Sequence, residues 1–135
     1  MKRYRFNGHW VGEFYDETYR ETIFIIWPVD GSKVTKFAKE KLDTDYDVDD
    51  DFTAETIEFE LTAGYYQVLA FKEWGPDISD YSFLAHEAFH AAKNILRARG
   101  GNPFGEGCEE PLAALIESIV RRSLTLLDKR PVKKL

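Results

Sequence analysis

Cysteine is nearly absent from this sequence, and the single one, Cys108, excludes an internal disulfide. A lone thiol is typical of proteins from a reducing compartment. No apolar run approaches the roughly 20 residues that a membrane-spanning helix needs. Residues 1–5 carry positive charge, but the apolar segment of a signal peptide does not follow them. We therefore expect a cytoplasmic protein with no membrane partner.

Positive charge is also in deficit, with 18 Lys and Arg residues against 24 Asp and Glu, for a net charge of −6. Contacts to phosphates need a basic face, so we expect no nucleic acid partner. Residues 129–135 are basic, and we interpret them as a solvated tail. With 44% hydrophobic and 15% aromatic residues in 135, the composition predicts one globular domain with a single core.

Histidine is scarce as well, yet two of the three histidines fall in an HExxH motif made by His86, Glu87 and His90. Residues four apart lie about 40° apart around a helix and one turn apart along it. Both imidazoles can therefore face one ion, while Glu87 stands beside them and can take a proton from water. The motif predicts a zinc site with His86 and His90 as ligands and Glu87 as general base.

The residues around the motif have the pattern of an amphipathic helix over residues 82–98. Asp77 and Ser79 offer N-cap oxygens upstream, and the glycines at 100–101 end the helix. The histidines fall roughly opposite the apolar face, which predicts that they look away from the core. The alternative is a pair of surface histidines on an ordinary helix. The apolar face consists of Leu84, Ala85, Ala88, Phe89, Ala92, Ile95 and Leu96.

A hydrolytic zinc site needs a third protein ligand and leaves the fourth position to water. A second amphipathic helix is predicted from about Glu109 to residue 127, with Pro111 in its first turn. Glu109 and Glu110 begin this helix about twenty residues after His90, across one glycine-rich turn, and either carboxylate is a candidate. The alternative is that both are acids that only favour a helix start. Cys108 could bind zinc as a thiolate, although a small core residue is the more common role.

The motif and the later glutamate together resemble the gluzincin branch of the zincin metallopeptidases. The matching residues are His86, Glu87 and His90, followed by Glu110 in the segment EPLAA. The sequence HEAFHAAKNIL…EEPLAALIE also resembles sequences of small zincin-like proteins from phages and mobile elements. The resemblance covers about the last 45 residues.

This resemblance implies that Glu110 is the third zinc ligand and Glu87 the general base. Ala114 stands where many gluzincins keep an aspartate that buttresses a ligand histidine, so the usual support of the ligands is in doubt. The helical wheel alone favours Glu109, which falls nearer the apolar stripe. We therefore take Glu110 as the first choice and Glu109 as the second.

The N-terminal half predicts the scaffold for these helices. Strands are expected at 9–15, at 21–27 and as a hairpin of 56–61 with 65–74, and a helix at 31–42. The fold class is therefore α+β: a small antiparallel or mixed sheet with an N-terminal helix and two packed C-terminal helices, as in a zincin.

The chain is expected to form a single domain, 1–135. Residues 1–76 are mainly sheet plus one helix, 77–128 form the two site helices, and 129–135 form the tail. Zincins use an edge strand to bind peptide substrate, and residues 65–74 are the candidate for that strand. A core strand is the equally favoured alternative.

These expectations lead to two functional hypotheses. The first is a Zn²⁺-dependent hydrolase, a minimal metallopeptidase acting on a peptide or protein substrate. The second is a catalytically silent zincin-like protein that binds or regulates a partner, such as a host protein of a phage. An accidental motif in a metal-free interaction domain is the remaining possibility.

Overall fold

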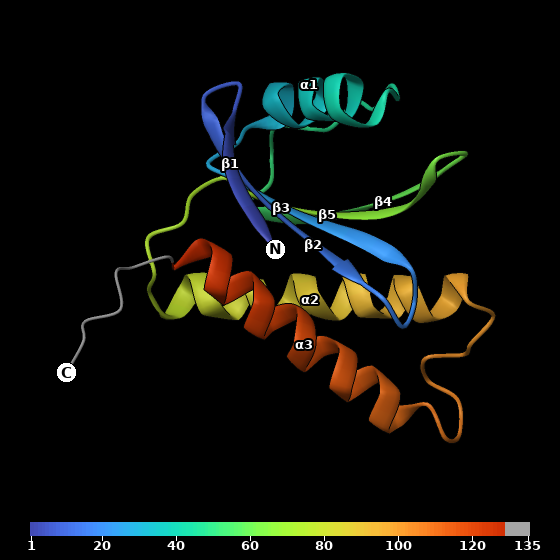
Figure 1. Cartoon of the computed structure of the whole chain (residues 1–135). Helices are drawn as coiled ribbons and strands as arrows, with labels where there is room; N and C mark the ends of the chain where they lie inside the picture. Colours follow the sequence, from blue (N-terminus) through green and yellow to red (C-terminus); the bar gives the residue numbers. More distant parts are fainter. Residues whose placement is uncertain (129–135) are drawn as a thin grey trace.

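The structure is a computed structural model and describes residues 1–128; the basic tail expected at 129–135 lies outside the described residues. The described chain forms five strands and three helices (Figure 1). No helix in this part of the chain is long and apolar enough to span a membrane. The strands are β1 (Lys2–Phe6), β2 (His9–Asp16), β3 (Glu21–Trp27), β4 (Ala54–Leu61) and β5 (Gly64–Phe71), and the helices are α1 (Gly31–Leu42), α2 (Ile78–Ala98) and α3 (Glu109–Leu127).

The strands form one mixed sheet in the order β1-β2-β3-β5-β4. Strands β3 and β5 are parallel, and every other neighbouring pair is antiparallel. Helix α1 and strand β4 lie between β3 and β5 in the sequence, so the chain crosses over before β5 enters the sheet. The expected α+β class, with its mixed sheet, N-terminal helix and two C-terminal helices, is confirmed.

Of the two equally favoured roles of residues 65–74, the edge strand is wrong and the core strand is confirmed. Strand β5 lies between β3 and β4, and its residues Val68, Leu69 and Ala70 are fully buried. A continuous apolar run of this kind is typical of an interior strand with a parallel neighbour. Strand β4 is the edge instead, and it carries the exposed side chains of Glu58 and Glu60.

Strand β1, which was not expected from the sequence, forms the opposite edge of the sheet. It pairs with β2 in antiparallel register, from Lys2 opposite Glu13 to Phe6 opposite His9. The basic residues of this strand interrupt the apolar pattern that would have predicted it from the sequence. In the structure the guanidinium of Arg3 lies 4.3 Å from the ring centroid of Trp10, so the charged side chain covers an aromatic surface.

Helices cover both faces of the sheet and create two separate cores (Figure 1). Helix α1 packs on one face through Val34, Phe37 and Ala38. Helices α2 and α3 pack together on the other face, as expected for the two predicted site helices. The sheet residues of the α1 face are Val11, Phe24, Ile26, Ile57, Phe59, Val68 and Ala70. Those of the α2–α3 face are Phe14, Ile23, Ile25, Trp27, Leu69 and Phe71.

His9 is fully buried on the α1 face, where its ring lies edge-on to Phe6 and Phe37. Its Nδ1 lies 3.1 Å from the carbonyl oxygen of Trp10, and its Nε2 has no hydrogen-bond partner within residues 1–128. Burial lowers the pKa of this imidazole, because a positive charge here would lose its hydration.

We expect the buried imidazole to make the protein less stable as the pH falls below about 6.5. The unfolded His9 then binds a proton that the folded His9 does not, so acid favours the unfolded state. The free energy of unfolding, measured by urea titration at about pH 7.5 and 5.5, should fall more in wild type than in His9→Gln. The same fall in both proteins would contradict this role.

Candidate functional site

Helix α2, which carries the HExxH motif, begins four residues before the expected start at residue 82. Asp77 is its N-cap, and the Asp77 carboxylate accepts a hydrogen bond from the Asp80 N–H at 3.0 Å. The Asp80 carboxylate reaches back to the N–H of Asp77 at 3.3 Å and of Gly75 at 2.9 Å. This reciprocal capping box satisfies donors that a helix start otherwise leaves unpaired, and it fixes where the helix begins.

The buried side of α2 is rotated from the expected one. Glu87 and Ala91 are buried, whereas Ala85, which was expected on the apolar face, is exposed. The helix therefore presents Glu87 to the sheet, and the histidines flank it. The side chain of His86 is 65% exposed, in agreement with the prediction that it looks away from the core.

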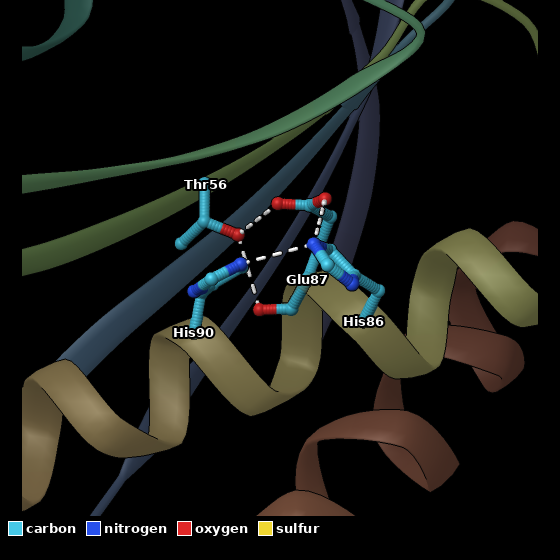
Figure 2. A network of polar contacts seen from close by, with 4 residues as sticks. All are labelled: Thr56, His86, Glu87 and His90. Carbon is cyan, nitrogen blue, oxygen red and sulfur yellow. Dashed lines mark hydrogen bonds and ion pairs between the residues drawn. The ribbon is translucent and has the colours of Figure 1, made fainter.

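The two histidines of the motif point at each other. Their Nε2 atoms lie 3.0 Å apart and their ring centroids 4.6 Å apart (Figure 2). Zinc–nitrogen bonds of about 2.0–2.1 Å in tetrahedral geometry place two ligand nitrogens about 3.3 Å apart. The pair thus has the separation of two ligands of one ion, and also that of a hydrogen bond between neutral imidazoles.

Glu87 lies beside the pair, with its carboxylate held against the edge strand. Its Oε1 accepts a hydrogen bond from the Thr56 hydroxyl of β4 at 2.8 Å, and its Oε2 lies 4.0 Å from His86 Nε2 (Figure 2). Only 5% of Glu87 is exposed. One carboxylate oxygen thus contacts the sheet, and the other faces the histidines.

Strand β4 lines this side of α2 with a polar row that the sequence analysis did not select. The alternation that buries Ile57 and Phe59 on the α1 face places Thr56, Glu58 and Glu60 on the α2 face. Partial loss of hydration, together with the neighbouring Glu60 carboxylate, raises the pKa of Glu58 to about 7. The alternation of β4 predicts that these three residues share a face, but nothing in it places Thr56 near the motif.

A chain of amides continues this polar surface along α2. The Asn94 amide donates to Gln67 Oε1 at 3.2 Å, and the Gln67 amide donates to Glu21 Oε1 at 3.0 Å. Gln67 and Glu21 are fully buried. Burial raises the pKa of Glu21, and its Oε2 has no partner among the described residues. The interface between α2 and the sheet therefore combines these polar contacts with apolar ones made by residues such as Ala91 and Ile95.

The structure does not bring the expected third ligand to the histidines. Glu109 and Glu110 are exposed in the first turn of α3, whose N-cap is the half-buried Cys108. Within residues 1–128 no group of three or more His, Cys, Asp or Glu side chains is close enough to hold a metal ion. The reason is the length of α2, which continues about 12 Å beyond His90 before the connector leads to α3 (Figure 1).

The donors present fit zinc in part. Two imidazole nitrogens at this separation, with a carboxylate beside them, match the ligand pair and the base of a hydrolytic site. A third carboxylate would have to approach from outside this group. Comparison of the chain with protein families, curated proteins and solved structures finds no match. The resemblance to gluzincins therefore stays a prediction.

The capping box provides a test of what fixes the helix that carries the motif. Asp77→Ala should lower the free energy of unfolding by about 0.5–2 kcal/mol, because the Asp80 N–H loses its acceptor. Asp77→Asn retains an acceptor and should stay close to wild type in urea unfolding. Equal destabilisation by both variants would assign the effect to charge rather than to capping.

Proposed function

We propose that this protein is a zinc-dependent hydrolase, and most specifically a minimal metallopeptidase. The observation that carries the proposal is the convergence of His86 Nε2 and His90 Nε2 at 3.0 Å, with the Glu87 carboxylate beside them. An accidental HExxH would not need its glutamate to be buried and oriented. Here the sheet holds Glu87 so that one oxygen faces the histidines.

The roles of the residues follow from their positions. Bound zinc supplies Lewis acidity, which lowers the pKa of water towards neutrality. His86 and His90 would hold the ion through their Nε2 atoms. Glu87 accepts the proton of the attacking water on Oε2 and then delivers it to the leaving amine. The edge strand β4 flanks α2, and its unpaired backbone groups are suited to bind an extended peptide.

Glu110 remains the proposed third ligand, with Glu109 as the second choice. Support comes from the order of the motif and the glutamate in the sequence, and from the exposure of both side chains next to the glycine-rich connector. Their approach to the histidines would require the first turn of α3 to move relative to α2. The proposal for the third ligand therefore depends on metal measurements.

Metal content tests the ligand set directly. We expect about one zinc per chain in wild type, and a clear loss in His86→Ala and Glu110→Ala when elemental analysis follows purification without chelator. Glu106→Ala, an exposed substitution in the connector that precedes α3, serves as the matched control. Zinc retained in Glu110→Ala but lost in Glu109→Ala would assign the third ligand to Glu109. No zinc in wild type, even after its addition, would reject the metal site.

The role of Glu87 is tested by Glu87→Gln, which keeps the shape of the side chain and removes the base. We expect the variant to bind zinc as wild type does and to lose hydrolysis of a mixed peptide pool, followed by mass spectrometry. A loss of about 100-fold or more is expected for removal of a general base. Activity that survives the substitution would show that another group takes the proton.

The alternative is a catalytically silent zincin-like protein that binds or regulates a protein partner. Two observations favour it: among residues 1–128 no third ligand lies with the histidines, and Ala114 provides no carboxylate to buttress a histidine. Stoichiometric zinc without hydrolysis of any peptide in the pool would support this alternative over the peptidase.

A further inference from the structure

Thr56 joins the edge strand to the HExxH glutamate by hydrogen bonding. Its Oγ1 lies 2.8 Å from Glu87 Oε1 and 3.0 Å from the Glu87 backbone oxygen (Figure 2). A hydroxyl has a single hydrogen, so it can donate a full hydrogen bond to only one of these two oxygens at a time. The backbone oxygen lies within α2 and can accept the helical hydrogen bond there. The carboxylate is the stronger acceptor, because hydrogen bonds to a charge are roughly twice as strong.

Burial makes this bond necessary for an ionised Glu87. The residue is only 5% exposed, and a buried carboxylate without a donor is unstable in its charged form. Thr56 donates to Oε1 and leaves Oε2 directed at His86, 4.0 Å away. The sheet thus selects one orientation among the several that a glutamate side chain can adopt.

We propose that Thr56 is the positioning residue of this site, holding Glu87 in the orientation in which Oε2 meets the histidine pair. This inference rests on the proposed hydrolase function and deepens it. Thr56 does not touch the metal or the substrate in this scheme. It acts through Glu87, so its loss misplaces the base without removing the base or the ligands.

The test uses Thr56→Val, which keeps the shape and removes the hydroxyl, and Thr56→Ser, which keeps the hydroxyl. We expect kcat on the peptide pool to fall about 10- to 100-fold in Thr56→Val, with KM and zinc content unchanged. Thr56→Ser should recover most of this loss. Thr62→Val, the same substitution at an exposed position of the β4–β5 turn, is the matched control and should resemble wild type.

Several results would overturn the proposal. The first is an unchanged kcat in Thr56→Val while Glu87→Gln is inactive. The second is a fall in kcat in Thr56→Val that Thr56→Ser does not recover. The third is a loss of zinc together with activity in Thr56→Val. The last result would make Thr56 part of the general support of α2 rather than a positioning residue.

A second measurement tests the positioning role of Thr56 without an assay of hydrolysis. Side-chain three-bond couplings of Glu87, measured by NMR on the metal-free full chain, report whether one rotamer or several are populated. We expect one rotamer in wild type and Thr56→Ser and averaging in Thr56→Val. A single unchanged rotamer in Thr56→Val would reject the role of Thr56. If wild type hydrolyses nothing, the proposed function fails and this measurement still decides.

Discussion

The packing of α2 against the edge strand β4 is the constraint on which the candidate site depends. It buries the carboxylate of Glu87, and a buried charge must be hydrogen bonded. Because Thr56 meets this requirement from the sheet, the orientation of Glu87 is fixed by tertiary structure rather than by the helix alone. The histidines of the same helix need no such partner, since His86 is largely exposed and His90 is half-buried.

Sheet topology places this contact at an open border of the molecule. The crossover from β3 to β5 inserts β5 into the interior and leaves β4 outermost. Helix α2 runs beneath these two strands, with Thr56 contacting it from β4 and Gln67 from β5. The buried side of α2 therefore contributes residues such as Leu84 and Ile95 to the apolar core, while Glu87 contacts the polar row of β4.

The fold class and most elements could be predicted from periodicity, because α1, α2, α3 and the β4–β5 hairpin have clear patterns. Strand β1 was missed because its exposed positions are basic, and the sequence left open whether residues 65–74 form an edge strand or a core strand. The apolar run of β5 indicates burial on both faces, but the order of strands is a tertiary property that local pattern does not contain.

The site shows the same division between local and long-range information. The relation of His86, Glu87 and His90 follows from helical spacing alone, and the structure brings these three together. Thr56 is 31 residues away in sequence, and no spacing rule connects it to the motif. The expected approach of Glu110 depended on how α2 and α3 are placed relative to each other, and local sequence patterns do not specify that placement.

The two borders of the sheet carry charges of opposite sign. Strand β1 has Lys2, Arg3 and Arg5 along one border, and β4 has Glu58 and Glu60 along the other. Two copies cannot join β4 to β4, or β1 to β1, without bringing like charges together across the new pair of strands. The charges therefore oppose a symmetric dimer in which the same edge strands of two copies pair. Without such pairing, the backbone of β4 stays accessible.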